Sequence, residues 1–172
     1  WSVQNRGDKD LYFQIGAHPA FYYRDLDANT CERGFLDFGK NTKTLKYISP
    51  AEKGCVSEKE HTLELHDGLM ELTSDTFGCD TYIFENGQVK KITLMDKQKV
   101  PYLSLEFSSP LVAVWSPSAA HPDVPFVCIA PWYGRCDKVG YHGEFKDREW
   151  MQHVEPGKSF EVGYSIILED VK

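Results

Sequence analysis

The feature that most constrains this chain is a recurrence of short runs in which apolar residues are continuous or alternate with polar ones. Such runs, when short and β-branched or aromatic, are typical of β-strands. Turn signals such as "NRGD", "ENGQ" and "EPGK" separate them at the spacing of an antiparallel sandwich or barrel. We therefore predict an all-β, mostly antiparallel fold, with strands over residues 11–15, 44–48, 81–86, 89–95, 102–107, 111–115, 126–130 and 159–168.

The segment 59–75, "KEHTLELHDGLMELTSD", is ambiguous by its hydrophobic pattern. Its leucines are irregularly spaced, which fits a strand followed by a helical turn better than one long helix. His61 and His66 lie in this charged segment, and we expect both to be solvated. No repeat or linker interrupts the chain, so we predict a single β-sandwich domain over residues 1–172.

Composition and charge exclude several classes of protein. With 41% hydrophobic residues, a chain of 172 residues can bury a sizeable core, and no apolar run is long enough to cross a bilayer. The formal net charge of −7 argues against a nucleic-acid or anionic-membrane partner, because both need clustered lysine and arginine. The five cysteines show no CxxC spacing, so we interpret them as reduced thiols of a cytoplasmic protein.

Motifs for the common cofactors and metals are absent. The sequence has no phosphate-binding glycine loop, no GxSxG elbow, no HExxH and no EF-hand loop. Its six histidines are dispersed, without the short spacing of a metal site. We therefore predict no cofactor and no metal.

One histidine has an unusual setting. In "IGAHPAF", His18 follows a Gly-Ala pair and precedes Pro19, which lacks the N–H needed for ordinary strand pairing. An imidazole can donate or accept a proton near neutral pH. From these residues alone, a packed histidine and a site histidine are equally good interpretations of His18.

Two further stretches carry candidate binding residues. In "FVCIAPWYGRCD", Trp132 and Arg135 follow an apolar strand. This arrangement is found in sites where a sugar packs on an indole ring while its hydroxyls bind polar groups. The alternative is that Trp132 is a core residue at a turn. In "FGCDTYIFENG", Asp80 precedes an apolar strand. It is either a turn residue or an acceptor for a ligand hydroxyl.

In their order along the chain, these stretches resemble the aldose 1-epimerase (galactose mutarotase) family, most closely its LacX-like branch. "IGAHPAF" resembles the His-Pro motif, "CDTYIFENG" the Asp-containing strand, "FVCIAPWYGRCD" the Pro-Trp loop and "HVEPGKSFEVGYSIIL" the closing strand. The resemblance implies a large antiparallel β-sandwich, the galactose mutarotase-like supersandwich. It also implies an isomerase that interconverts α and β anomers of a free hexose.

The resemblance also implies roles for individual residues. His18 aligns with the general acid that protonates the ring oxygen. Asp80 aligns with a ligand of a sugar hydroxyl, and Trp132 is expected to form a wall of the site. Arg135, from its place beside Trp132 in the sequence, is also expected to bind the sugar.

The sequence departs from the family pattern in two respects. Where the family carries its glutamate base, "IAPW" places Ala130, and a methyl group accepts no proton. Asp137 and Glu144 are candidate replacements. In addition, "WSVQN" reads as part of a strand, so we expect that N-terminal strands of the family domain, with a further histidine and an arginine, precede this segment.

Four functions remain open from the sequence. The first is an anomer-interconverting enzyme, and the second is a carbohydrate-binding protein without catalysis, for which Ala130 is the main argument. The third is a hexose-6-phosphate epimerase, which needs a cationic pocket from Arg24, Arg135 and Arg148. The fourth is a structural β-sandwich without a ligand. The sequence predicts neither the identity of the sugar nor the oligomeric state.

Overall fold

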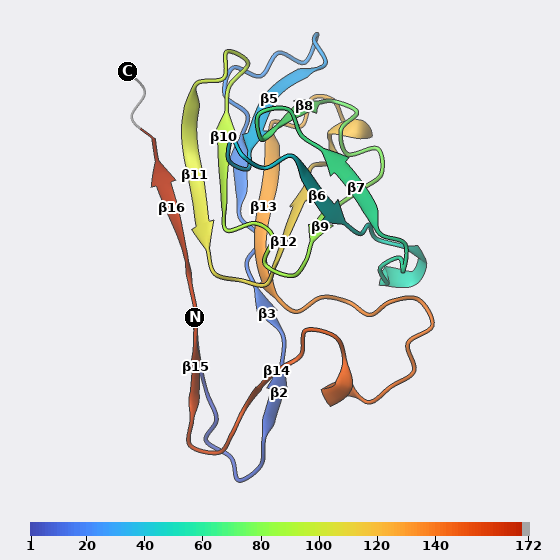
Figure 1. The fold of residues 1–172 in the computed structure, drawn as a ribbon, viewed down its shortest axis with the longest axis vertical. Helices are drawn as coiled ribbons and strands as arrows, with labels where there is room; N and C mark the ends of the chain where they lie inside the picture. Colours follow the sequence, from blue (N-terminus) through green and yellow to red (C-terminus); the bar gives the residue numbers. More distant parts are fainter. Residues whose placement is uncertain (170–172) are drawn as a thin grey trace.

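The structure is a computed structural model that describes residues 1–169, apart from the side chain of Lys53. Almost all of its regular structure is β-strand (Figure 1). The short helices are 3₁₀ turns: η1 (Glu52–Gly54), η2 (Pro117–Ala119) and η3 (Phe145–Asp147). Within the described residues, none of the helices has the length and apolar character needed to cross a membrane. The predicted all-β class is confirmed.

Two five-stranded antiparallel sheets form the body of the molecule. Sheet I has the order β16-β11-β10-β5-β8, and sheet II has the order β3-β13-β12-β9 with β4 also paired to β13. The strands of sheet I are β5 (Glu32–Asp37), β8 (Leu69–Thr73), β10 (Lys91–Met95), β11 (Pro101–Phe107) and β16 (Tyr164–Leu168). Those of sheet II are β3 (Ile15–Gly16), β4 (Ala20–Tyr22), β9 (Tyr82–Phe84), β12 (Leu111–Trp115) and β13 (Phe126–Tyr133).

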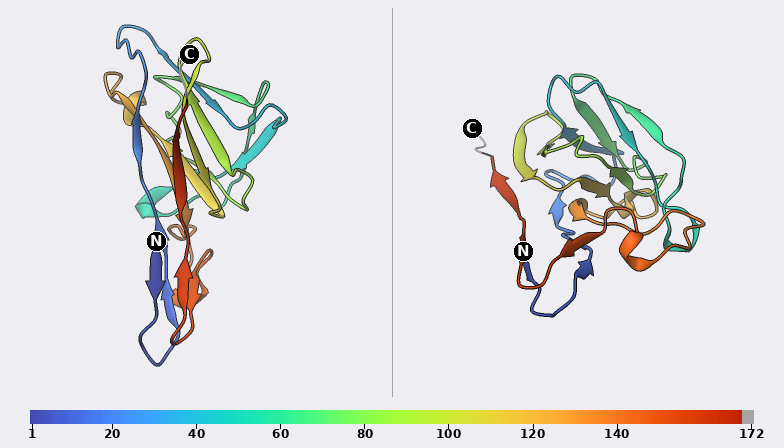
Figure 2. Two further views of the ribbon diagram at one scale, coloured as in Figure 1. Left: turned by 90° about the vertical axis from the view of Figure 1, so that its left-hand side faces the viewer. Right: turned by 60° about the horizontal axis from the view of Figure 1, so that its bottom comes forward.

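Three two-stranded antiparallel ribbons extend this body. Two of them project below the sandwich, as Figure 1 and the side view in Figure 2 show. They pair β1 (Ser2–Gln4) with β15 (Ser159–Glu161), and β2 (Leu11–Phe13) with β14 (Gln152–Val154). The third pairs β6 (Thr44–Tyr47) with β7 (His61–Glu64) beside sheet II, where β6 contacts β9.

The main core lies between the two sheets. Successive side chains of a strand point to opposite faces of the sheet. On β12 and β13, one face contributes Val112, Val114, Val127 and Ile129 to the core, where they pack with residues of sheet I. The other face of sheet II carries a smaller apolar cluster that includes Ala113 and Ala130. Sheet II therefore presents a second face away from the sandwich core, and that face holds the candidate site.

The structure corrects the interpretation of residues 59–75. The segment forms two strands, β7 and β8, and the expected helical turn is a tight turn at Asp67 and Gly68, both with positive φ (53° and 77°). A Cβ on Gly68 would lie 2.1 Å from the carbonyl oxygen of Gly39, so only glycine fits there. His66 is exposed as expected, while His61 is partly buried and stacks on Tyr47.

The single-domain division over residues 1–172 stays a prediction, and its last three residues lie outside the described part. Strand β16 is at one edge of sheet I. Its Ile166 and Leu168 side chains are exposed. Edge strands of this kind offer unpaired backbone groups to a further strand.

Candidate functional site

The structure brings the sequence-predicted residues together on the outer face of sheet II. One pocket, of about 460 Å³, is lined by His18, Trp132 and Arg135 among others. A second, of about 240 Å³, is lined by His18, Asp80, Ala130 and Trp132 among others. Because His18, Thr81 and Trp132 line both pockets, the two adjoin.

Small side chains form the floor of the second pocket. Ala113 on β12 pairs with Ala130 on β13, and Cys128 lies two residues earlier on the same face. Trp115 and Trp132 flank these small residues. The hollow therefore follows from the strand pattern itself, in which alanine and cysteine alternate with the valine and isoleucine of the core.

Strand register places His18 opposite Ala130. Gly16 pairs with Trp132 and Ala20 pairs with Cys128, with three residues between them on either strand. The residue midway between Gly16 and Ala20 is His18, and the residue midway between Cys128 and Trp132 is Ala130. Directly opposed Cβ atoms in an antiparallel pair are about 4.5–5.5 Å apart. His18 and the position of the expected base are therefore cross-strand neighbours.

The residue pairs on either side of His18 and Ala130 explain why regular strand pairing is interrupted at His18. Ala17 N–H donates to Pro131 O over 3.0 Å, and Ile129 N–H donates to Pro19 O over 3.3 Å. Each of these pairs contains a proline, which has no N–H to return the second hydrogen bond. The exposed His18 imidazole meets Trp115 edge to face, with ring centroids 6.2 Å apart.

Trp132 helps to hold the His18 segment. Its indole Nε1–H donates to Ala17 O over 3.0 Å, so this N–H is already used within the protein. The ring lines both pockets and remains available for apolar contact. Its position is compatible with the expected wall of a sugar site. Its hydrogen bond to Ala17 also fixes the His18 segment, a role that the sequence did not indicate.

Gly16→Ala is expected to lower the free energy of unfolding by about 1–3 kcal/mol and to reduce activity, because overpacking a close contact forces neighbours to move. A Cβ on Gly16 would lie 2.5 Å from Trp132 Cδ1. Urea denaturation measures the stability. Gly163→Ala is the matched control, since a Cβ there meets nothing within 4 Å. Equal stability of the two variants would contradict the tight packing of Trp132 on Gly16.

Asp80 is both a turn residue and a pocket residue. Its backbone is left-handed (φ 71°) and its N–H donates to Phe77 O over 2.9 Å. Thr81 Oγ1 donates to Asp80 Oδ1 over 2.7 Å. Among the described residues that line the two pockets, Asp80 is the only one with a carboxylate. Both sequence interpretations of Asp80 are therefore compatible with its place.

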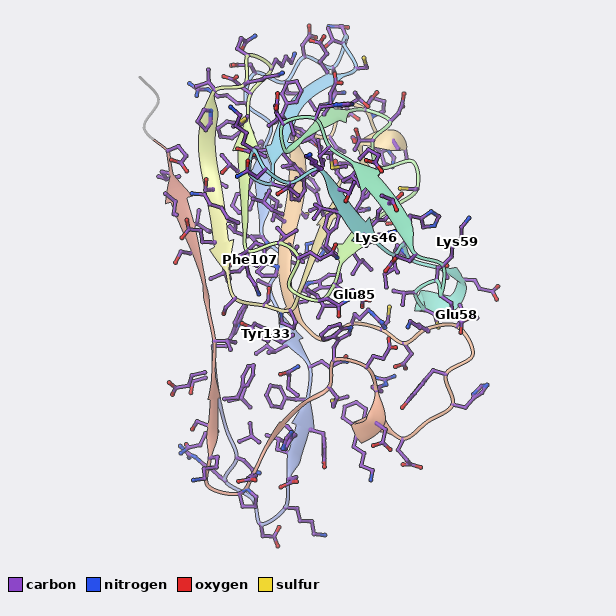
Figure 3. All side chains as sticks on the ribbon, in the orientation of Figure 1. Lys46, Glu58, Lys59, Glu85, Phe107 and Tyr133 are labelled. Atoms are coloured by element: carbon purple, nitrogen blue, oxygen red, sulfur yellow. The ribbon has the colours of Figure 1, made fainter. Side chains whose placement is uncertain are left out.

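Arg135 is held by carboxylates. Its side chain is 1% exposed, its Nε donates to Glu85 Oε1 over 2.6 Å, and its NH2 group pairs with Glu149. Trp150 Nε1 donates to the same Glu85 oxygen over 2.8 Å. Burial disfavours the guanidinium charge, but the hydrogen bonds that Arg135 donates to Glu85 and Glu149 outweigh it and raise the pKa of Arg135. Figure 3 shows Glu85 near the end of β9, beside the loop that follows β13.

The carboxylates proposed to replace the glutamate base do not line either pocket. Asp137 pairs with Arg148 over 2.6 Å, and Glu144 is exposed on the loop before η3. The cationic pocket required for a phosphorylated sugar is not formed from the expected arginines either, because Arg24 and Arg148 line neither pocket. The described residues also contain no cluster of His, Cys, Asp or Glu suited to a metal ion.

Several pocket residues escaped the sequence reasoning, namely Gln14, Thr81, Trp115 and Cys128. Cys128 was detectable, since it shares the strand face of Ala130 by the period of two. Burial raises the pKa of the Cys128 thiol to about 11, so it stays protonated. Trp115 joins the site only through its pairing with Cys128, which the sequence does not show.

No known family model matches the sequence, and no curated protein matches it. Solved structures do match. A galactose mutarotase related enzyme from Lactobacillus acidophilus shares 27% identity with a TM-score of 0.81, over 98% of this chain and 56% of that one. A galactose mutarotase-like protein from Lactobacillus casei shares 22% identity with a TM-score of 0.82, over 98% and 57%.

A more distant match shows the fold alone. A galactose mutarotase-like protein from Clostridium acetobutylicum shares 12% identity with a TM-score of 0.59, over 98% of this chain and 51% of that one. The chain thus spans little more than half the length of the solved structures that it resembles. Its own sheets correspond to the galactose mutarotase-like sandwich over that length.

Proposed function

Because the chain belongs to the galactose mutarotase-like family, we propose that it takes part in interconverting the α and β anomers of a free hexose, as a member of the LacX-like branch. The observation that carries this proposal is the convergence of His18, Asp80 and Trp132 on adjoining pockets, with His18 opposite position 130. These residues lie far apart in the sequence and share no task in the sandwich core. A cytoplasmic location is part of the proposal and rests on the cysteine pattern.

The reaction needs two proton transfers. His18 donates a proton to the ring oxygen while a base removes the proton of the anomeric hydroxyl, so that the C1–O5 bond breaks and an open-chain aldehyde forms. Rotation about C1–C2 and the reverse transfers close the ring on the other face. His18 and the base are restored by that reversal, and no atom of the sugar is lost.

Asp80 is the carboxylate that the pockets offer for the second proton transfer or for a sugar hydroxyl. One of its oxygens already accepts a hydrogen bond from Thr81, which leaves the other oxygen for a ligand. The Trp132 ring supplies the apolar face on which a pyranose packs. Arg135 acts as a positioning residue in this scheme, because its charge is already paired with Glu85 and Glu149.

A carbohydrate-binding role without catalysis is the second candidate, and Ala130 favours it. This residue is 1% exposed and occupies the base position with a methyl group. Loss of a general base typically costs about 10²- to 10⁴-fold in rate. Such a protein would keep the sugar-binding pockets but leave the anomers to interconvert at the uncatalysed rate.

Polarimetry of freshly dissolved α-glucose and α-galactose distinguishes the two candidates. We expect this chain to accelerate mutarotation weakly and Ala130→Glu to raise the rate by about 10²-fold or more, because the new carboxylate stands beside His18. Asp80→Asn should abolish the weak activity of the parent. Ala113→Glu is the matched control, since Ala113 is the cross-strand partner of Ala130 in the same pocket.

Sugar binding, followed by calorimetry, completes the test. Binding without acceleration by the parent would establish the second candidate. If neither the parent nor Ala130→Glu accelerates mutarotation, the anomer-interconverting function of this chain is wrong. If Ala113→Glu is as active as Ala130→Glu, a carboxylate anywhere in the pocket suffices and the cross-strand geometry is not the cause.

A further inference from the structure

A second polar cluster lies away from the two pockets. Among the described residues, the buried side-chain nitrogen and oxygen atoms without a hydrogen-bond partner are Tyr23 Oη, Arg33 Nε and Ser118 Oγ. All three residues are more than nine-tenths buried, with exposed fractions of 4%, 1% and 0%. Buried polar groups are normally satisfied, so an unpaired set calls for a physical reason.

All three residues belong to or contact one loop, residues 116–125, which joins β12 to β13. Arg33 donates from NH2 to Pro122 O over 2.7 Å, and the backbone N–H of Tyr23 donates to Pro125 O over 2.8 Å. Ser118 belongs to the loop itself. Burial raises the pKa of the Tyr23 hydroxyl, and hydrogen-bond interactions with the Ser116 and Ser118 hydroxyls and the Arg33 charge partly oppose that rise. Tyr23 is therefore close to both Ser118 and Arg33.

The charge of Arg33 has no counter-ion in this cluster. Its terminal nitrogens donate to backbone carbonyls of Thr30, Glu32 and Pro122. The ion pairs between described residues do not include Arg33. Hydrogen bonds from the backbone and side chain of Asn29 and, more weakly, the charge of Arg33 lower the pKa of Asp27. The Asp27 carboxylate is exposed and does not pair with Arg33. A buried charge without a partner is costly.

We propose that Tyr23 Oη–H, Arg33 Nε–H and Ser118 Oγ–H bind a small monovalent inorganic anion, of the size of chloride. Arg33 Nε can only donate a hydrogen bond, and both hydroxyls can rotate to donate. An anion accepts from all three donors and also balances the guanidinium charge. A water molecule would satisfy the hydrogen bonds but leave the charge uncompensated.

The position of this anion site links it to the two segments that frame the pockets. Tyr23 directly follows β4, whose start is two residues beyond His18. Ser116, which accepts a hydrogen bond from Ser118 N–H, directly follows Trp115. Because the His18 and Trp115 rings are in contact, the anion stabilises both ends of that contact. This role is structural and does not depend on the proposed isomerase activity.

Two measurements on the full chain test the proposal. Crystals soaked in sodium bromide should show an anomalous peak between the three side chains. Thermal unfolding at constant ionic strength should give a Tm about 3 °C or more higher in sodium chloride than in sodium gluconate, with a saturable dependence on chloride. The proposal would be overturned by equal Tm values in sodium chloride and sodium gluconate, together with a site that shows no bromide signal and holds only water.

Variants assign the effect to these residues. Ser118→Ala and Tyr23→Phe should each lose most of the chloride-dependent rise in Tm. Ser109→Ala is the matched control, because this serine is equally buried and its hydroxyl donates to Leu111 O elsewhere in the fold. It should keep the full rise even if it unfolds at a lower temperature. If Ser118→Ala and Tyr23→Phe both keep the full chloride effect, the anion binds at another place and the assignment is wrong.

Discussion

Replacing His18 with glutamine is expected to lower the mutarotation rate by about 10²- to 10⁴-fold, with sugar affinity changed only severalfold. The imidazole is the group proposed to protonate the ring oxygen, and a general acid contributes rate enhancement of this size. Glutamine keeps a polar side chain that can hydrogen-bond but cannot transfer the proton. Since His18 is exposed, its loss should leave the fold intact.

The measurement is polarimetry with His18→Gln in both the parent and the Ala130→Glu background. The second background keeps the test decisive where the parent is slow. His121→Gln serves as the control, because His121 is exposed and lines neither pocket. If His18→Gln retains the activity of the Ala130→Glu background, His18 is not the acid.

The second large effect concerns stability. Arg135→Ala should lower the free energy of unfolding by about 3–5 kcal/mol, the usual cost of removing one partner of a buried ion pair. The Arg135 side chain is 1% exposed and that of Glu85 is 16% exposed, so Glu85 would keep a largely buried, unpaired charge. Urea denaturation monitored by tryptophan fluorescence gives the value.

An exposed ion pair provides the control for this prediction. Lys91 and Glu106 are 3.1 Å apart across β10 and β11, with side chains about half exposed. Lys91→Ala should cost at most about 1 kcal/mol, because solvent screens such pairs. If Arg135→Ala costs as little as Lys91→Ala, the Arg135 network does not hold the loop that begins at Gly134. The residue would then be free to bind the sugar directly, as expected from the sequence around Trp132.

Several strands were predictable because a half-buried strand shows a residue pattern with a period of two, which a short stretch of sequence displays. That is why 111–115 and 126–130 correspond to β12 and the first part of β13. The predicted strand 159–168 is instead divided between β15 and β16, which belong to different sheets. Residues 59–75 were misread, because leucine spacing does not distinguish a helical turn from a hairpin. At this turn, Gly68 lies so close to Gly39, which is distant in the sequence, that a Cβ would not fit.

The sequence indicated several residues that line the candidate pockets, but it did not indicate how these residues are arranged. The motifs around His18, Asp80 and Trp132 singled out residues that do converge on adjoining pockets. The replacement carboxylates were misplaced: Asp137 and Glu144 are close to Trp132 along the chain, yet they lie outside both pockets. Distance along the chain says little about direction once the chain leaves a strand for a long loop.

By itself, then, the sequence determined the strand-based fold, the polarity of its strand faces and the residues able to carry the chemistry, because these depend on local period and residue type. Tertiary structure alone decided which of these residues meet. It placed His18 opposite Ala130 through strand register, and it paired Arg135 with Glu85 and Glu149. It also left the Arg33 charge buried without a carboxylate. Each of these outcomes depends on contacts between segments that are distant in the chain, which residue type and spacing do not encode.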